Sequence, residues 1–592
     1  MYRSRRRRHE EMGCWIAILV VLALVAAGLI ATNVGGLRSA LLAVLGDERR
    51  NQIVAFTSSL TAPKLETADM VPIRYTGVNP LGVNTFLEQE ADVNKQRETL
   101  QMIKDAGIGW IRQQFPWEDI EEPSKGMYWD EKYGQSSWNK YDNIVNLANQ
   151  YGIQMIVRLD LPPKWAHPGN PWPQSPPDNF NDYGDFVYTV VSRYKGKVKF
   201  YQLWNEPNLA TEWGNKSVDA KAYVQLLKVG YQRAKEADPN CVILSAALAP
   251  TIEQSWRAMD DQIYLQQMYD AGAKDYFDIL SVQAYGLRSG PDDHRLTLRD
   301  VNFSRPLLDR QIMVKNGDAS KPIWASEMGW NAQPPSVTAE PIFGRVSEQL
   351  QAQYTVRAFQ RAAEEWPWMG VMNIWFFKRA DDHEKDQPFY YFRMVEPDFA
   401  THPVYDAVKA LGTAPPAIHR GYFQEDDWVL QYRGSWTQVN APQASLGGMK
   451  QTNDAGASIA GTFEGTDLTL VVPKGPGFDA AYVEIDGSAQ GANRLQHDEA
   501  GRALVQEKAA EPLWQQQVPI AVGLSNSLHS FQITTAGPFA LDGLIVDAPT
   551  AGSPLQQLPR LLPYAGVGAL ALLLVLTLRL RTRAKYRGRL RF

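Results

Sequence analysis

The sequence predicts an α/β fold: a (β/α)8 TIM barrel followed by an antiparallel β-sandwich of jelly-roll type, flanked by two single transmembrane helices. Three observations predict it. Short apolar runs alternate with amphipathic helical stretches over residues 71–412. Over residues 413–547 the helical pattern stops, and short alternating runs are separated by Gly, Asp and Asn. Two uncharged apolar runs stand near the ends of the chain, each with an arginine-rich flank.

The first and last segments predict a membrane anchor at each end. Residues 13–32 and 561–578 are each long enough to cross a bilayer as a helix. The flanking tails, residues 1–12 and 579–592, hold five arginines and seven lysines or arginines. Because basic flanks stay inside, we expect both termini to be cytoplasmic and residues of about 33–560 to lie outside a plasma membrane, with the lipid bilayer as a partner. The alternatives are a cleaved signal peptide for the first run and a buried core helix for the second.

Composition excludes several classes of protein. The chain has 592 residues, of which 44% are apolar and 21% are charged, so it is not a mostly disordered chain. The net charge of −5 combines two basic tails with a strongly acidic middle, so we expect no nucleic-acid partner. The two cysteines, Cys14 and Cys241, exclude an internal disulfide framework, because Cys14 lies in the first apolar run.

Residues 33–70 have loose helical spacing and predict a stalk before the barrel. The barrel strands are expected at Tyr75–Asn79, Trp110–Gln113, Gln154–Leu159, Lys199–Trp204, Val242–Ala246, Ile279–Gln283, Ile323–Ser326 and Val371–Phe376. Helices are expected at Val93–Ala106, Trp138–Tyr151, Tyr183–Tyr194, Ala220–Ala237 and Val346–Glu365. The alternative is an open doubly wound sheet, but no Gly-rich phosphate turn follows an early strand.

The predicted β-sandwich lies between the barrel and a Pro- and Gly-punctuated linker at residues 548–560. Its strands are expected at Trp428–Tyr432, Ser458–Phe463, Leu468–Val472, Ala481–Ile485, His529–Thr534 and Leu541–Val546. Its Gly-containing turns resemble those of jelly-roll carbohydrate-binding or accessory modules. This region is predicted to be either a glycan-binding domain or a spacer, and the sequence does not decide between them.

Two glutamates follow predicted barrel strands, at the end of the barrel where active sites are built. Glu206 lies in residues 204–207 (Trp-Asn-Glu-Pro) after the fourth strand, and Glu327 lies in residues 326–330 (Ser-Glu-Met-Gly-Trp) at the end of the seventh. Glutamate is depleted in strands, and a charge at such a position is costly without a function. Two carboxyls facing across a cleft suit glycosidic bond cleavage: one protonates the leaving oxygen, and the other attacks the anomeric carbon or activates water.

Residues 204–207 resemble the acid/base motif of clan A glycoside hydrolases, and residues 326–330 resemble the nucleophile strand of that clan. Among its families the chain is most similar to family 39, with family 5 next, and the resemblance covers residues 71–412. It implies a (β/α)8 barrel that retains anomeric configuration. It also implies that Glu206 is the general acid/base and that Glu327 is the nucleophile.

The same resemblance implies further substrate-binding residues. Asn205 would bind the sugar 2-hydroxyl, Tyr285 would orient the nucleophile, and Arg112 would keep the nucleophile ionised. Trp375 would form the floor beneath the sugar at the cleavage point. Gln283 stands where related enzymes often have a histidine, which changes the hydrogen bonds available to the sugar.

Tryptophans supply flat apolar faces on which pyranose rings stack, and several fall in loops after predicted strands. These are Trp117, Trp165, Trp172, Trp213 and Trp330. We expect Trp165 and Trp330 to bind substrate, against the alternative that such residues only pack in the core or in loops. The Pro-rich run at residues 161–179 predicts a stiff loop that forms one wall of the cleft.

No cofactor and no metal are expected. Residues 381–386 carry several carboxylates, which favour a solvated or substrate-contacting loop over a calcium site. Zinc motifs are absent from the sequence, and Ser326 lacks the G-x-S-x-G context of an esterase. Arg158 and Asp160 would pair at the barrel mouth.

The sequence therefore predicts a membrane-tethered, outward-facing retaining glycosidase that acts on a β-linked poly- or oligosaccharide, with exopolysaccharide and cell-wall glycan as candidates. Two alternatives stay open. A transglycosidase would have the same motifs, with a sugar hydroxyl intercepting the glycosyl-enzyme. A non-catalytic glycan-binding surface protein would keep the barrel without turnover.

Overall fold

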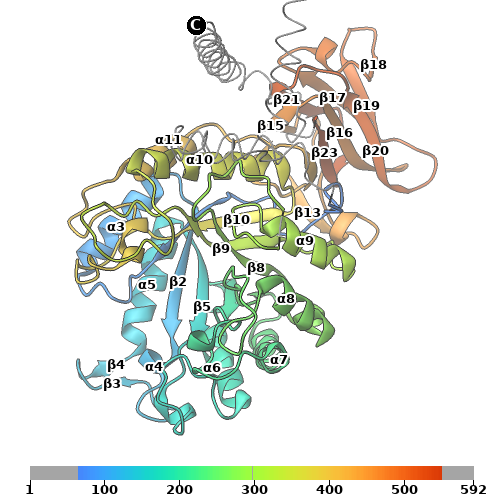
Figure 1. Cartoon of the computed structure of the whole chain (residues 1–592). Helices are drawn as coiled ribbons and strands as arrows, with labels where there is room; N and C mark the ends of the chain where they lie inside the picture. Colours follow the sequence, from blue (N-terminus) through green and yellow to red (C-terminus); the bar gives the residue numbers. More distant parts are fainter. Residues whose placement is uncertain (1–64, 297, 550–592) are drawn as a thin grey trace, which may run out of the picture. The chain divides into compact units, whose positions relative to one another are not determined.

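The computed structural model describes residues 65–296 and 298–549. Parallel strands and helices alternate as far as Gly412, and antiparallel strands follow from Gly421 to Asp547 (Figure 1). The division of the chain into domains at these positions stays a prediction.

Eight parallel strands form one sheet in the order β7-β6-β5-β2-β1-β10-β9-β8. Their bounds are β1 (Leu81–Thr85), β2 (Trp110–Pro116), β5 (Gln154–Asp160), β6 (Phe200–Leu203), β7 (Val242–Leu244), β8 (Leu280–Tyr285), β9 (Ile323–Gly329) and β10 (Met369–Ile374). Between β7 and β8 the ladder is reduced to single parallel bridges, Leu244 with Ile279 and Leu248 with Val282. The sheet is a nearly closed barrel, so the carboxyl ends of its strands meet at one mouth.

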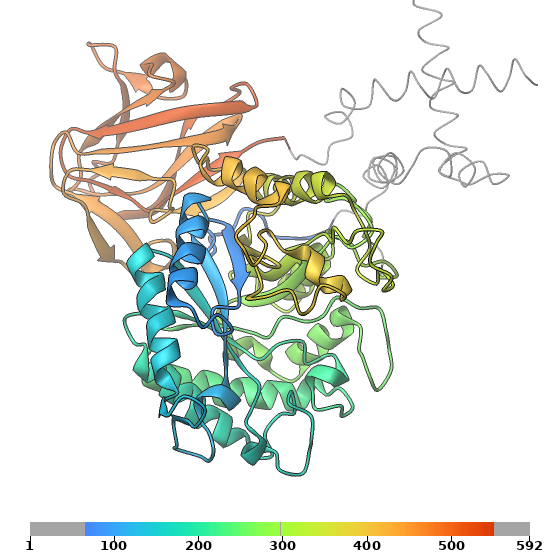
Figure 2. The same ribbon diagram turned by 90° about the vertical axis from the view of Figure 1, so that its left-hand side faces the viewer.

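Helices surround this sheet (Figure 2). They are α3 (Val93–Asp105), α4 (Trp117–Ile120), α5 (Trp138–Tyr151), α6 (Phe180–Arg193), α7 (Ala220–Ala237), α8 (Asp261–Asp270), α9 (Pro306–Lys315), α10 (Glu348–Glu365) and α11 (Pro403–Gly412). Five begin at a side-chain cap that accepts a backbone N–H of the first turn: Asp92, Asn179, Asp219, Asp260 and Ser347. All five predicted helices are present, with ends displaced by at most a few residues.

The interior of the barrel is apolar at one end and polar at the other. Trp110, Phe200 and Trp324 pack with ring centroids 5.0–5.1 Å apart. Their strands β2, β6 and β9 are not neighbours in the sheet, so the rings meet across the interior. Since side chains alternate between the two faces of a strand, the next inward residues lie two positions further on. On β2 and β6 these are Arg112 and Gln202, which begin the polar layer beneath the mouth.

The predicted first strand was wrong. Tyr75–Asn79 is irregular, and Tyr75 has a φ of +62°. Its carbonyl accepts the Trp324 indole N–H at 2.9 Å, while Asn79 Oδ1 accepts the Leu81 N–H at 2.9 Å. The first strand is β1, directly after Pro80. Both runs are short and apolar, so only pairing with β2 and β10 distinguishes them. The other seven predicted strands overlap the observed ones.

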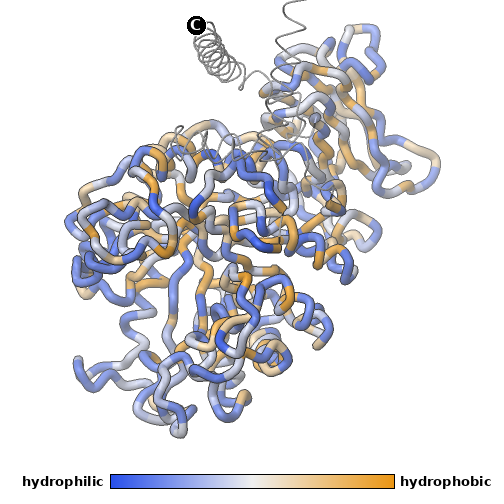
Figure 3. The backbone as a smooth tube through the Cα atoms, in the orientation of Figure 1, coloured by the Kyte–Doolittle hydropathy of each residue, from blue (hydrophilic) through white to orange (hydrophobic). Residues whose placement is uncertain are grey.

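The C-terminal strands form three antiparallel sheets, ordered β11-β23-β16-β20, β12-β15-β21-β17-β19-β18 and β13-β14-β22. The strands are β11 (Gly421–Gln424), β12 (Gln431–Arg433), β13 (Thr437–Asn440), β14 (Gly448–Thr452), β15 (Ser458–Gly465), β16 (Asp467–Lys474), β17 (Ala480–Ile485), β18 (Gln496–His497), β19 (Ala503–Gln506), β20 (Leu513–Ala521), β21 (Ser527–Thr535), β22 (Phe539–Leu541) and β23 (Gly543–Asp547). Figure 3 shows hydrophobic residues along these strands and hydrophilic residues in the loops.

The two larger C-terminal sheets share one core, since Ile459 of β15 and Leu470 of β16 belong to the same buried cluster. Two sheets packed face to face are a β-sandwich, as the alternating pattern predicted. Six strands of this region were not predicted: β11, β13, β14, β18, β19 and β20. The longest of them, β20, carries three consecutive glutamines, which hide its apolar alternation. The jelly-roll type and the glycan-binding role of the sandwich stay predictions.

The predicted fold class and location need a correction. The segments expected to cross a membrane, residues 13–32 and 561–578, lie outside the described residues. Within residues 65–296 and 298–549, every helix is too short or too polar to span a bilayer. The fold class is therefore corrected to the barrel and the sandwich that the described residues form. Neither the transmembrane helices nor the plasma-membrane location is carried further.

Gly82 of β1 tests the packing of the barrel interior. A Cβ at this position would lie against Asn373 Oδ1 and 2.8 Å from Val371 Cγ1. We expect Gly82→Ala to lower the free energy of unfolding by about 1–3 kcal/mol, because neighbouring strands cannot move apart freely. Urea denaturation followed by tryptophan fluorescence measures it. Gly169→Ala is the control, since nothing lies within 4 Å of its added Cβ. Equal stability of the two variants would contradict the packing argument.

Candidate active site

The barrel mouth brings the two predicted glutamates into one site. Glu327 lies in β9, and Glu206 follows β6 by three residues. Their charges interact, and each also interacts with Arg158 of β5. Residues that are 121 positions apart in the sequence thus share one electrostatic environment at the carboxyl ends of the strands.

Arg112 of β2 is the centre of the hydrogen-bond network, and its residue is only 3% exposed. Its Nε donates to Gln202 Oε1 at 2.8 Å. Its Nη1 donates to Asn84 Oδ1 at 2.8 Å and to Glu327 Oε1 at 2.9 Å. Its Nη2 donates to Asn205 Oδ1 at 2.9 Å. The planar guanidinium therefore fixes both the Glu327 carboxylate and the Asn205 amide.

Tyr285, at the end of β8, holds the other oxygen of the same carboxylate. Its hydroxyl donates to Glu327 Oε2 at 2.8 Å. Burial and the neighbouring charge of Glu327 raise the pKa of Tyr285 well above its ordinary value, so the hydroxyl keeps its proton. With Arg112 on one oxygen and Tyr285 on the other, the carboxylate has a fixed plane and position.

The side chains that accept hydrogen bonds from Arg112 are fixed by further hydrogen bonds. Ser326 Oγ donates to Gln202 Oε1 at 3.0 Å, and Gln202 Nε2 donates to the Trp204 carbonyl at 3.0 Å. Asn84 Nδ2 donates to the Ser326 carbonyl at 2.9 Å. These supporting bonds connect strands β1, β6 and β9, so the site is preorganised by the barrel and not by its loops.

Glu206 sits on a strained turn. Trp204 and Glu206 have φ values of +75° and +45°, in the left-handed region that costs non-glycine residues energy. The turn is secured by the Glu206 N–H, which donates to the Ala247 carbonyl at 2.9 Å. Asn208 Nδ2 also donates to the Ala249 carbonyl at 2.8 Å. The strain is thus balanced by bonds to the neighbouring loop.

Glu206 carries a proton at neutral pH. Burial, followed by the carboxylates of Glu212 and Glu327, raises its pKa to about 8, and the Gln283 amide and Arg158 oppose this rise. A carboxyl that keeps its proton at neutral pH can donate it to a neighbouring group. The Gln283 amide of β8 thus lowers the pKa of Glu206, whereas the Tyr285 hydroxyl on the same strand donates a hydrogen bond to Glu327.

Glu212 is a site residue that the sequence analysis missed. It ends a short helical turn, Ala210–Glu212, whose position is fixed because the Trp204 indole N–H donates to the Glu212 carbonyl at 3.0 Å. Burial raises the pKa of Glu212 to about 7, Arg158 opposes the rise, and Asp160 and Glu327 add to it. The only signal in the sequence was its place in the loop after the Glu206 motif.

Arg158 and Asp160 of β5 lie in this same cluster. They form the ion pair that the sequence analysis expected, with Arg158 Nε 2.8 Å from Asp160 Oδ2. Both residues face the mouth because they are two positions apart on one strand. The charge of Arg158 also lowers the pKa of Glu206 and of Glu212, in addition to its pairing with Asp160.

The three tryptophans expected to bind substrate have different surroundings. Trp330 is 1% exposed, and its indole N–H donates to the Ser289 carbonyl at 2.7 Å, so no face is free for a sugar. Trp165 is half-buried, and its indole donates to the Glu121 carbonyl at 2.8 Å. Trp375 follows β10 at the mouth and is partly exposed, with its ring 5.6 Å from that of Phe86.

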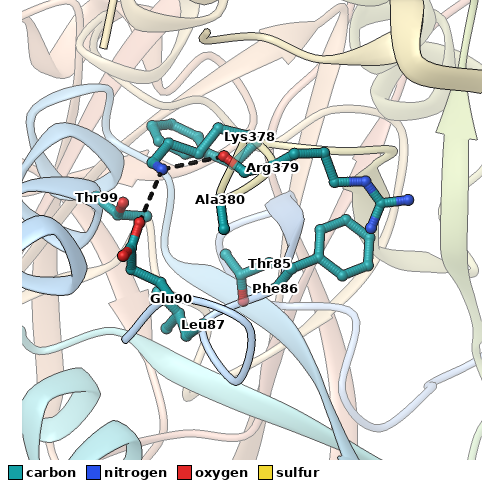
Figure 4. A pocket seen from close by; sticks show the side chains of 9 residues that line it. Thr85, Phe86, Leu87, Glu90, Thr99, Lys378, Arg379 and Ala380 are labelled. Carbon is teal, nitrogen blue, oxygen red and sulfur yellow. Dashed lines mark hydrogen bonds and ion pairs between the residues drawn. The ribbon is translucent and has the colours of Figure 1, made fainter. Parts of the chain in front are cut away.

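A small pocket lies beside Trp375, where β1 and β10 end (Figure 4). Lys378 Nζ lies 3.4 Å from Glu90 Oε2 across it, and the Arg379 guanidinium stacks on the Phe86 ring at 3.8 Å. Its lining is polar on one side and aromatic on the other. The residues are Thr85, Phe86, Leu87, Glu90, Thr99, Phe377, Lys378, Arg379 and Ala380.

Metal-ligating side chains are not gathered in the part of the chain that the structure describes: no group of three or more His, Cys, Asp or Glu residues is placed to hold an ion. In the acidic loop at residues 381–386, Asp381 and His383 are exposed and pair with each other at 2.7 Å.

Comparisons with known proteins agree with this chemistry. Residues 72–256 match the family model of cellulases, glycosyl hydrolase family 5. A 6-phospho-beta-glucosidase of Clostridium longisporum is 24% identical over 180 residues, covering 26% of this chain and 37% of that protein. The chain thus spans little more than a third of the length of this curated relative.

Solved structures with a similar arrangement include a family 39 glycoside hydrolase of Bacteroides cellulosilyticus WH2. It is 19% identical, with a TM-score of 0.44 over 80% of this chain and 82% of that one. The GH39 enzyme of Xanthomonas axonopodis pv. citri is 13% identical, with a TM-score of 0.42 over 79% and 96%. These likenesses are too distant to bear on the site. The family-model match supports a glycoside hydrolase of clan A, as the two glutamate motifs predicted.

Removing Arg112 tests whether its network holds the site together. Arg112→Ala would remove a hydrogen-bond donor from buried oxygens of Glu327, Gln202, Asn84 and Asn205. We expect it to lower the free energy of unfolding by about 3–5 kcal/mol, because an unpaired buried charge remains. Chemical denaturation measures this. The control is Arg193→Ala, which removes a surface pair with Asp142 and should cost about 1 kcal/mol or less. A similar loss in both variants would contradict the central role of Arg112.

Proposed function

We propose that this protein is a retaining glycoside hydrolase that cleaves O-glycosidic bonds of a β-linked poly- or oligosaccharide. The observation that carries the proposal is that two carboxyls in one site have different hydrogen-bond donors and different neighbouring charges. Glu327 accepts hydrogen bonds from Arg112 and Tyr285, which suits a nucleophile. Glu206 has its pKa raised to about 8 by burial and neighbouring carboxylates, which suits a proton donor.

In the first step a Glu327 oxygen attacks the anomeric carbon, and the bond from that carbon to the leaving oxygen breaks. Glu206 gives its proton to the leaving oxygen, so no alkoxide is released. The products of this step are the leaving sugar and a glycosyl ester on Glu327. Arg112 and Tyr285 hold the carboxylate plane during the attack.

In the second step Glu206, now a carboxylate, takes a proton from water as the water oxygen attacks the anomeric carbon. The ester bond to Glu327 breaks, and both glutamates return to their starting states. The esterified Glu327 carries no charge, so one of the carboxylates that raise the pKa of Glu206 is lost in the intermediate. The pKa of Glu206 therefore falls, so that Glu206 is ionised in the intermediate and can act as the base.

Other residues of the site fit supporting roles. Asn205 has its carbonyl oxygen bound to Arg112, which turns its amide nitrogen outward for the sugar 2-hydroxyl. Trp375 supplies an apolar face beneath the sugar at the cleavage point. Gln283 acts on Glu206, and its amide can also meet a sugar hydroxyl. Trp330 is assigned no role in stacking because it is buried, whereas the half-buried Trp165 stays a candidate.

A transglycosidase remains the second candidate, because a sugar hydroxyl can replace water in the second step with the same residues. Product analysis separates the two: hydrolysis produces new reducing ends, and transfer produces longer chains. A glycan-binding protein without turnover would bind the same sugars and release nothing.

Substitution of the two glutamates tests the assignment of roles. Glu327→Gln should abolish turnover of every substrate. Glu206→Gln should lower kcat/KM by about 10²–10⁴-fold for an oligosaccharide. It should have much less effect on kcat/KM for an aryl glycoside with a good leaving group, because that bond breaks without protonation. Initial rates of reducing-end and aryl-alcohol release measure both. Near-native rates of Glu327→Gln would sink the proposal.

The pH profile tests the role of Glu212. The basic limb of wild-type kcat/KM should have an apparent pKa near 8, since activity needs protonated Glu206. Glu212→Gln removes a negative charge, so the pKa of Glu206 should fall and the basic limb should move to lower pH. The charged groups facing Glu212 are Glu206, Glu327, Asp160 and Arg158.

The control for this profile is Glu236→Gln, which changes an exposed carboxyl on α7 that pairs with Arg233. It should leave the basic limb in place. A basic limb that stays unchanged in Glu212→Gln, or that moves equally in both variants, would remove Glu212 from the site.

A further inference from the structure

Three loops at the barrel mouth are joined around the loop that carries Glu206. The loop after β5 reaches it through Asn170 Nδ2, which donates to the Gly214 carbonyl at 2.8 Å. The loop after β7 reaches it through the Arg257 carbonyl, which accepts the Ala210 N–H at 2.6 Å. The Trp256 carbonyl also accepts the Val218 N–H at 3.2 Å. The three loops therefore form one connected surface.

Two tryptophans on this surface expose much of their side chains. Trp172, in the loop after β5, is 43% exposed, and Trp256, in the loop after β7, is 54% exposed. By contrast, Trp204 and Trp213 in the loop between them are buried. Each of these indoles presents an apolar face that water solvates poorly, on a loop that is bonded to the loop of Glu206.

The backbone around both indoles is fixed before any ligand binds. Pro171 and Pro173 flank Trp172, whose N–H donates to Asn170 Oδ1 at 3.0 Å. Trp256 lies in a turn closed by the Ser255 N–H, which donates to the Ala258 carbonyl at 2.9 Å. Little conformational entropy is lost when such a surface binds a ligand, so its contacts contribute more fully to affinity.

The side of the cleaved bond that this surface serves follows from its attachment to the Glu206 loop. Glu206 meets the leaving oxygen, so its loop lies on the leaving-group side. Trp375 and the small pocket belong to β10 and β1, on the opposite part of the barrel sheet. Trp172 and Trp256 are therefore placed to meet sugars that lie beyond the leaving oxygen.

We propose that Trp172 and Trp256 bind sugar units on the leaving-group side, so that the substrate is a chain of several sugars and not a glycoside with a small aglycone. The proposal rests on the proposed glycosidase function. Pyranose C–H faces stack on indole rings. The exposed side chains of Glu253 and Arg257 stand beside Trp256 and can bond sugar hydroxyls.

The test compares two kinds of substrate in the full chain. One is a p-nitrophenyl β-glycoside, which has no sugar on the leaving side. The other is the β-1,4-linked pentasaccharide of the same sugar, for glucose, xylose and mannose in turn. We expect Trp172→Ala and Trp256→Ala each to lower kcat/KM for the pentasaccharide about tenfold. Both variants should stay within about twofold of wild type on the aryl glycoside.

Trp428→Ala is the matched control. Trp428 is also 43% exposed, but its N–H donates to the Gly77 carbonyl, before β1, at the end of the barrel away from the mouth. It should change neither rate. Equal losses on both substrates would overturn the proposal, and so would no loss on either. A wild type that cleaves neither kind of substrate overturns the glycosidase function itself, and this inference with it.

Discussion

The site depends on one buried cation. The Arg112 guanidinium is shut off from water in the barrel interior, where a charge must be paired and every N–H needs an acceptor. Its acceptors come from β1, β6 and β9 and from the turn after β6. These strands lie on different sides of the barrel, so the hydrogen bonds of one side chain fix the position of the Glu327 carboxyl relative to the Asn205 amide, which is next to Glu206. The hydrogen bonds that hold the strands around Arg112 are therefore also the bonds that set the geometry of the site.

The two glutamates differ because their neighbours differ. Glu327 receives N–H and O–H donors directly, whereas Glu206 is surrounded by carboxyls, and its cation, Arg158, is shared with Asp160, Glu212 and Glu327. Burial without a cation of its own keeps the proton on Glu206. One residue type therefore has two different environments within the same mouth, and the charge of Glu212 interacts with both glutamates.

Loops on two sides of the mouth differ in what they present. Where β1 and β10 end, a small pocket is lined by Phe86, Lys378, Arg379 and their neighbours. Around the Glu206 loop, Trp172 and Trp256 are exposed, and the charged side chains of Glu253 and Arg257 lie beside Trp256. A rigid barrel makes this difference possible, because the loops on its two sides can differ without disturbing the network at Arg112.

The sequence by itself determined the barrel, the sandwich and the two glutamates, because strand and helix periods are local and a charge after an apolar strand is conspicuous. It could not separate Tyr75–Asn79 from β1, since two short runs differ only in their partners. It also could not tell the buried Trp330 from the exposed Trp172, or find Glu212, whose significance comes from neighbours on other strands. The membrane helices predicted from two apolar runs with basic flanks lie outside the described residues, within which no helix could span a bilayer. Burial, pairing and proximity are properties of the folded chain, so only the tertiary structure decided them.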